Sequence, residues 1–292
     1  MKITNLFNIP EPLYRFALKD GYSKGKADFS VTEIISPPRV QRLRHRHWEE
    51  MEQDASASLW ALLGSALHSV AERSQVDNHT NEERLFVEVD GITLSGAIDL
   101  QHERDGKIEI TDYKFTSVYS LKRTKPEWEQ QQNIYAWLVQ KVKGKPVSGL
   151  RVCAILRDWT RREAENSPSY PQAPIQVVDI NLWNFEYTDR FVRERVESHR
   201  QAKVKDDWGE ELPLCTDEEK WTRPTFYAVK KEGGKRALKV FESKENAEAL
   251  ARETPKGYVE ERLGEPIRCN GNYCGVSQWC SQFKREKEDE RL

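Results

Sequence analysis

The sequence has no strong excess of charge of either sign. Its 46 Lys and Arg residues nearly balance its 48 Asp and Glu residues, which leaves a formal net charge of −2 over 292 residues. The protein is therefore not a polycation, and any contact with nucleic acid must come from local basic stretches such as RVQRLRHRH at residues 39–47. A single stretch of this kind is usually a solvated helix or loop, and we interpret it in that way.

Long apolar runs are also absent. No stretch approaches the length that spans a membrane, and the opening residues MKITNLFNIPEP lack the apolar region of a secretory signal peptide. We therefore expect a cytoplasmic protein with no membrane partner. Cysteine is scarce, with five residues, and none of them forms a C-x-x-C pair. An odd number in a reducing compartment argues against a disulfide framework, and clustering in the second half favours a metal site.

Aromatic residues, in contrast, are plentiful. Nine Trp, ten Phe and ten Tyr supply enough apolar area for a substantial core. Helical periodicity predicts helices at about 56–74, 127–142 and 182–205. Alternating patterns predict strands at 85–89, 92–103, 107–116, 149–159 and 175–180, the first three joined by Asp-Gly turns. This order predicts an α/β fold with a mixed central β-sheet flanked by helices.

Changes in pattern divide the chain into three parts. Residues 1–29 are irregular, and residues 30–206 carry the predicted sheet and helices. Residues 207–292 contain a hairpin with a Gly-Gly turn, a short helix and four of the five cysteines. We expect this last part to be a small metal-cluster subdomain packed on the core.

Residues 109–117 read EITDYKFTS, a strand with an acid and a base on one face. Asp112 and Lys114 are two residues apart, so they point the same way. Pairing around the second Asp-Gly turn places Asp99 opposite Asp112. Two such carboxylates repel each other unless a divalent cation lies between them, and Mg²⁺ suits this position because it keeps several waters. Lys114 can then orient or help to deprotonate an attacking water, which predicts phosphodiester hydrolysis.

Four motifs follow one another in the sequence. They are Gly64 with His68, Gly96 with Asp99, Asp112-Tyr113-Lys114, and Gln131 with Tyr135. This order of G-x-x-x-H, G-x-x-D, D-Y-K and Q-x-x-x-Y resembles that of the RecB-type PD-(D/E)XK nucleases, over residues from about 30 to 205. The resemblance implies a restriction-endonuclease-like core in a bacterial or phage-encoded protein.

The resemblance also implies roles for individual residues. The metal ligands, for Mg²⁺ or Mn²⁺, would be His68, Asp99, Asp112 and the carbonyl of Tyr113. The catalytic residues would be Lys114, Asp112, Asp99, Gln131 and Tyr135. Gln131 and Tyr135 lie one helical turn apart and would hold DNA or orient the lysine. A histidine alone on an apolar helix is more often a core residue than a ligand, and an ordinary buried polar pair is the alternative for Gln131 and Tyr135.

The cysteines define a second candidate site. Cys269, Cys274 and Cys280 are close in sequence, and Cys215 is the fourth member we choose. Four thiolates at this loose spacing suit a [4Fe–4S] cluster better than zinc, which usually takes C-x-x-C pairs, although zinc stays open. Cys153, in an apolar strand, is the competing ligand. The set is similar to that of AddAB-type nucleases and CRISPR-associated exonucleases, but their first cysteine precedes the nuclease motifs.

Together these features predict a metal-dependent DNA nuclease. The cluster-bearing relatives imply an exonuclease acting on single strands or duplex ends, in recombination, repair or phage DNA processing. The alternative is a non-catalytic nucleic-acid-binding subunit on the same fold, because a fold alone does not establish activity. The sequence does not decide the oligomeric state.

Overall fold

The computed structural model of the chain describes residues 1–19, 23–74, 76–122 and 125–289. The chain forms two compact units. The first comprises Met1–Ser36 and His47–Gly209, and the second comprises Pro37–Arg46 and Glu210–Leu292. The sequence placed a boundary after residue 206, three residues before this division, and kept residues 37–46 in the core. The structure instead groups that early segment with the C-terminal unit.

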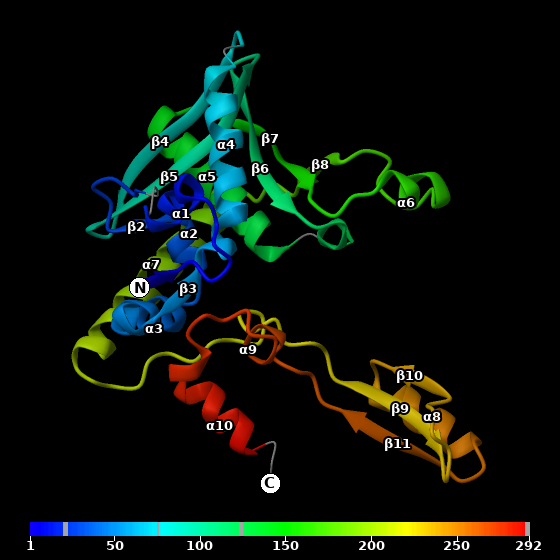
Figure 1. Cartoon of the computed structure of the whole chain (residues 1–292). Coiled ribbons are helices and arrows are strands. Elements are labelled where there is room, and N and C mark those ends of the chain that lie inside the picture. The colour runs from blue at the N-terminus through cyan, green and yellow to red at the C-terminus, as the bar shows by residue number, and fades with distance from the viewer. Residues whose placement is uncertain (20–22, 75, 123–124, 290–292) are drawn as a thin grey trace. The chain divides into compact units, whose positions relative to one another are not determined.

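A six-stranded mixed sheet forms the centre of the first unit (Figure 1). Its strands are β2 (Phe29–Ser30), β4 (His79–Val89), β5 (Ile92–Arg104), β6 (Lys107–Thr116), β7 (Val147–Leu156) and β8 (Ile175–Ile180). Strands β4, β5 and β6 are antiparallel neighbours, β6 and β7 run parallel, and β8 is antiparallel to β7. This arrangement confirms the predicted fold class.

The two Asp-Gly turns set the register of β4, β5 and β6. Asp90 and Gly91 have φ angles of 50° and 79°, and Asp105 and Gly106 have φ angles of 51° and 72°. Positive φ at both central residues is the geometry of a tight turn whose twist matches antiparallel strands. The turns therefore fix which residues of the three strands face one another.

The helices of the first unit are α1 (Glu11–Leu18), α2 (Val31–Ile35), α4 (Leu59–Arg73), α5 (Pro126–Lys143), α6 (Arg161–Asn166) and α7 (Phe185–Asp207). Of these, α2, α4 and α5 contact strands of the sheet directly. The first unit also contains the parallel pair β1 (Lys2–Thr4) and β3 (Glu52–Asp54), and the 3-10 helices η1 (Trp48–Glu50), η2 (Ala55–Ser58) and η3 (Val118–Leu121). The N-terminal segment that the sequence left irregular thus contains a short strand and a helix.

Helix α5 supplies most of the helical core. Pro126 begins it, and Gly144, with φ of 65°, ends it. Ile134, Trp137 and Leu138 are fully buried against the sheet. As a crossover between the parallel strands β6 and β7, this helix is covered on nearly every side, which explains its lack of a polar face.

Helix α4 differs from this pattern. Figure 1 shows it on the other side of β5 and β6 from α5. No α4 residue is buried, and Trp60 and Val70 are 42% and 61% exposed. The helix itself is as predicted. Leu62, Leu63 and Leu67 of α4 are half-buried.

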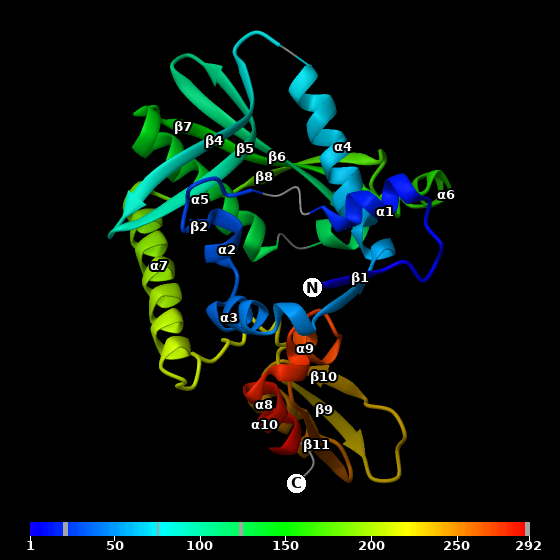
Figure 2. The ribbon, with the colours of Figure 1, turned by 60° about the vertical axis from the view of Figure 1, so that its left-hand side comes forward.

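The second unit is smaller. It contains α3 (Pro38–Arg46), β9 (Phe226–Lys231), β10 (Lys239–Phe241), α8 (Lys244–Glu253), β11 (Gly257–Arg262), α9 (Ile267–Asn270), η4 (Ser277–Trp279) and α10 (Ser281–Asp289). Strands β10, β9 and β11 form an antiparallel sheet, visible in Figure 2. The predicted Gly-Gly hairpin and short helix are present, whereas β11 was not predicted. Within the described residues, no helix of either unit is long and apolar enough to cross a membrane.

Candidate active site and cysteine-lined cavity

The two acidic residues of the predicted site stand where β5 and β6 separate. The ladder between these strands ends at Leu100 opposite Thr111, so the next position brings Asp99 and Asp112 face to face. There the Tyr113 N–H donates to Asp99 Oδ2 at 2.8 Å, in place of the strand-to-strand bond. The parting of the strands exposes one edge of each to a ligand.

Asp112 is the most unusual side chain of the site. It is 1% exposed, and neither of its carboxylate oxygens accepts a hydrogen bond. Lys114 Nζ lies 2.6 Å from Asp112 Oδ2 as an ion pair, with its side chain 29% exposed. A buried carboxylate is costly without hydrogen-bond donors, and a single lysine leaves most of its acceptor positions free. Asp112 therefore keeps acceptor positions free for a further cationic partner.

A third acid and a histidine complete the cluster. One potential ligand atom from each of His68, Glu82 and Asp99 lies within 4.8 Å of the other two. His68 Nδ1 is 2.5 Å from Glu82 Oε1 and 3.9 Å from Asp99 Oδ1. Helix α4 thus brings its histidine next to acidic residues of β4 and β5.

The charges in this cluster perturb one another. Burial, followed by repulsion from Asp112, raises the pKa of Asp99 to about 7, although Lys114 and the Tyr113 amide act in the opposite direction. The hydrogen bond to Glu82 raises the pKa of His68. Negative charge is therefore concentrated beyond what the local cations neutralise, as expected of a site for a divalent cation.

Glu82 was missed by the sequence analysis, which began the strand at Leu85. In the structure β4 begins at His79, and Glu82 interrupts its pairing with β5 with a φ of 53°. Extending the register from the first Asp-Gly turn would have placed this acid opposite Asp99. Glutamate is not a residue type that predicts a positive φ, so the φ of Glu82 could not be expected from the sequence.

Gln131 and Tyr135 lie on α5 against the same strands. Gln131 Nε2 donates to the Tyr135 hydroxyl at 2.7 Å, and both side chains are buried. A Cβ added to Gly96 would lie 2.9 Å from a Tyr135 ring carbon, three residues before Asp99. The glycine of the G-x-x-D motif therefore allows α5 to approach β5 closely.

The cluster offers carboxylate oxygens and one imidazole nitrogen. These are suitable ligands for Mg²⁺ or Mn²⁺, and the unsatisfied oxygens of Asp112 add to the set. Within the chain as described, it is the only group of three or more such side chains with ligand atoms this close together.

The second unit contains a cavity lined by cysteines. All four predicted cluster ligands line it: Cys215, Cys269, Cys274 and Cys280. Burial raises the pKa of Cys215 to about 12 and of Cys269 to about 11, and neighbouring thiols of the same group add to both shifts. Four thiolates around one cavity would repel one another and would therefore need cationic partners. Cys153, the competing ligand, instead lies on β7 of the first unit, paired with Tyr113 and Val177.

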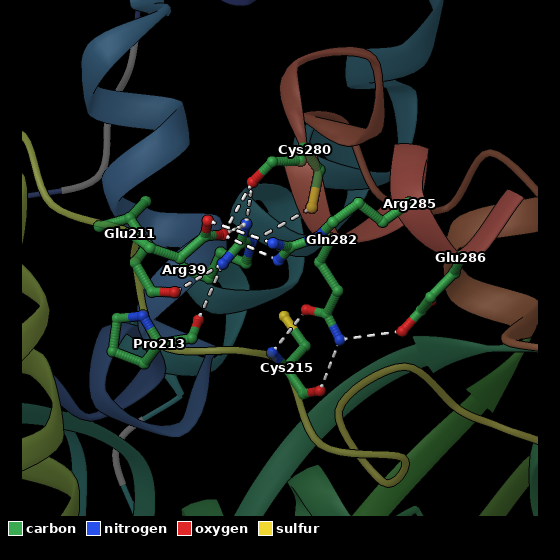
Figure 3. A network of polar contacts seen from close by, with 10 residues as sticks. Arg39, Glu211, Pro213, Cys215, Cys280, Gln282, Arg285 and Glu286 are labelled. Atoms are coloured by element: carbon green, nitrogen blue, oxygen red, sulfur yellow. Dashed lines mark hydrogen bonds and ion pairs between the residues drawn. The ribbon is translucent and has the colours of Figure 1, made fainter. Parts of the chain in front are cut away.

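Two side chains organise this cavity (Figure 3). Gln282 accepts from the Cys215 N–H at 2.8 Å and donates to the Cys215 carbonyl at 3.0 Å. Arg39, 2% exposed, donates to Cys280 Sγ at 3.3 Å and to the Leu212 carbonyl at 2.7 Å. Arg39 belongs to the basic stretch that we expected to be solvated. Its side chain is instead a structural part of the cavity wall.

Comparison with known proteins agrees with this geometry. Residues 32–281 match the family model of the PD-(D/E)XK nuclease superfamily, and the chain belongs to this superfamily. No curated protein sequence matches the chain.

Solved structures with similar backbones include that of SSO0001, with 19% identity and a TM-score of 0.43 over 64% of this chain and 84% of that one. An exonuclease candidate from Eubacterium rectale matches with 11% identity and a TM-score of 0.30, over 70% of this chain and 75% of the other.

Proposed function

We propose that the protein is a metal-dependent deoxyribonuclease of the RecB type. The observation that carries the proposal is the buried Asp112 carboxylate, which accepts no hydrogen bond and lies beside Lys114 and opposite Asp99. A nearby cation would stabilise both carboxylates in their charged form.

Each residue of the cluster has a part in this proposal. Those that would hold Mg²⁺ or Mn²⁺ are His68, Asp99, Asp112 and the Tyr113 carbonyl, with Glu82 as a further oxygen ligand. Such a cation would polarise a phosphate and lower the pKa of water. Lys114 is placed to orient the attacking water and to stabilise negative charge on the phosphate. Gln131 and Tyr135 would position Lys114 or the substrate strand from α5.

The substrate class follows from the resemblance. We propose DNA as substrate, cleaved from ends or in single strands, in recombination, repair or phage DNA processing. Hydrolysis adds the oxygen of water to phosphorus and releases the leaving oxygen of the neighbouring nucleotide with a proton. A non-catalytic binding subunit is the alternative that the following experiment would reveal.

The test is cleavage of end-labelled single- and double-stranded DNA with Mg²⁺, with Mn²⁺ and with EDTA. We expect metal-dependent cleavage by the wild type and a loss of at least about 100-fold in Lys114→Ala, as is typical for a group that activates water. Lys145→Ala removes an exposed lysine paired with Glu103 and should keep full activity. Absence of cleavage by metal-loaded wild type on every substrate would favour the binding subunit.

We further propose a [4Fe–4S] cluster on the four cysteines of the second unit. Tetrahedral zinc at about 2.3 Å from each sulfur holds its thiolates about 3.8 Å apart. The four cysteines line one cavity and lack the C-x-x-C pairs that zinc sites usually have, which supports a cluster rather than zinc. A cluster of this kind would link residue 215 to the last helices and stabilise the second unit.

Iron and acid-labile sulfide in protein purified without oxygen test this assignment. We expect about four of each per chain. Cys215→Ser should lose them, and Cys153→Ser, matched in chemistry but lying on β7, should keep them. Stoichiometric zinc with no sulfide would replace the iron–sulfur assignment by a zinc site.

A further inference from the structure

An exposed tryptophan lies at the start of α4. Trp60 is 42% exposed, and the guanidinium of Arg157 lies 4.7 Å from the centre of its ring. A flat aromatic face backed by a cation is a surface on which a nucleic-acid base stacks, because every base has a π face.

This pair is in line with the candidate metal ligands. Trp60, Gly64 and His68 recur every four residues, so they follow one side of α4, about 12 Å from first to last. Nothing lies within 4 Å of the position that a Gly64 Cβ would take. The space between the tryptophan and the metal-binding cluster is therefore open at the middle of the stripe.

The pair is also attached to the catalytic strand. The Arg157 N–H donates to the Thr116 carbonyl at 2.9 Å, two residues after Lys114 on β6. The next residue, Asp158, accepts from the Val118 N–H at 2.7 Å, so its negative charge is engaged by the backbone. The stacking surface is thus held at a fixed place relative to Asp112 and Lys114.

Positive charge accompanies the aromatic surface. Lys125 lies 5.4 Å from the centre of the Trp128 ring, and the proximity of Arg157 contributes, after burial, to lowering the pKa of Lys125. Two cations close enough to repel each other would both be stabilised by the phosphates of a bound strand.

We propose that Trp60 and Arg157 form a base-stacking platform for single-stranded DNA, about two to four nucleotides from the phosphate held at the His68, Asp99 and Asp112 cluster. The proposal rests on the proposed nuclease function and gives it a substrate class. Bases in a duplex are already stacked on their neighbours, so only an unpaired strand can offer a face to Trp60.

The test measures binding without cleavage, so that it can be read whether or not the protein proves to be an active nuclease. Fluorescein-labelled twelve-residue oligothymidylate is titrated with protein in EDTA and followed by anisotropy. We expect Trp60→Ala and Arg157→Ala each to weaken binding by about 5-fold or more. Trp60→Phe should recover most of the loss. Trp208→Ala, which removes a tryptophan 78% exposed elsewhere in the first unit, should bind as the wild type does.

A second oligonucleotide isolates the stacking contribution. On a strand of the same length built from abasic sites, Trp60→Ala and wild type should bind equally, because no base is present to stack. Equal binding of the thymidylate strand by Trp60→Ala and Trp208→Ala would overturn the proposal. An equal loss of affinity in Trp60→Ala for both oligonucleotides would also overturn it, as would a wild type that does not bind the thymidylate strand. Cleavage tested with Lys114→Ala reports separately on the nuclease function.

Discussion

His199 shows how strongly a single buried residue of the first unit depends on its surroundings. Its ring on α7 is 2% exposed, and Nε2 lies 3.1 Å from both the Ile34 and the Ser36 carbonyls. Burial, and then the charge of Arg195, lowers its pKa from 6.5 to about 4. The neutral imidazole therefore joins α7 to the end of α2, and its protonation opposes folding.

The first prediction concerns this histidine. As the pH falls below 6.5, the unfolded chain binds a proton that the folded chain binds only near pH 4, so stability is lost across that window. From pH 7.5 to pH 5 we expect His199 to account for about 2 kcal/mol of the loss. Urea unfolding in EDTA at both values should show this loss reduced in His199→Gln and unchanged in His45→Gln, on the exposed face of α3. The same loss in His199→Gln as in wild type would refute the assignment.

Individual site residues differ in how far the sequence predicts them. Asp99 and Asp112 lie opposite each other because the strands pair around the Asp105-Gly106 turn, and an Asp-Gly pair indicates the type of that turn. Glu82 was missed because the predicted strand began at Leu85, although the register of the first Asp-Gly turn could have placed it opposite Asp99. Arg39 was missed because its partners lie more than 170 residues away in the chain, and local spacing carries no information about them.

At the scale of elements, two glycines on neighbouring segments have opposite surroundings. A Cβ on Gly96 of β5 would lie 2.6 Å from Leu138 Cδ1 and 3.0 Å from Val31 Cγ2, whereas a Cβ on Gly64 of α4 meets nothing within 4 Å. The first glycine sets how closely α5 and α2 approach the sheet. The second only costs helix stability, since glycine is a poor helix former.

The second prediction compares these glycines. Gly96→Ala should destabilise the first unit by about 1–3 kcal/mol, because side chains of the helices have to move away from β5. Gly64→Ala should leave stability unchanged or raise it by about 0.5–1 kcal/mol. Thermal unfolding of the two variants beside the wild type measures both effects. A destabilised Gly64→Ala would mean that α4 packs more closely than the structure shows.

The elements themselves were largely predictable. Strands β4 to β8 and helices α4, α5 and α7 follow from periodicity and turn residues, because each has a clear pattern. The exposure of α4 could not be predicted in this way, since periodicity indicates a helix but not what lies against it. Strand β11 and helix α9 are short, and their positions depend on packing within the second unit rather than on local pattern.

At the scale of the whole molecule, the second unit is assembled from two distant stretches of chain. Arg39 connects them: besides Cys280 and Leu212 it contacts Glu211 at 2.9 Å and Ser281 at 2.5 Å. A planar guanidinium is suited to so many acceptors, and the ammonium of a lysine is not. Charged hydrogen bonds of this kind stabilise by about 1.5–3 kcal/mol each when buried.

The third prediction follows from this residue. Arg39→Met should leave buried carbonyls without donors, so amides of residues 210–215 and 280–289 should exchange hydrogen at least about tenfold faster than in wild type. Arg44→Met, an exposed position on the same helix, should exchange as wild type does. Hydrogen exchange followed by mass spectrometry localises the change. Faster exchange confined to α3, or none at all, would contradict the role of Arg39.

The two stretches of the second unit are also synthesised at different times. Synthesis at about 5–20 residues per second would separate α3 from residue 210 by about 10–30 s, while residues 47–209 are made. During that interval the first unit is completed, whereas the partners of α3 in the second unit do not yet exist. The second unit therefore closes only when the last part of the chain has been made, and any stall before it leaves Arg39 without the carbonyls it binds.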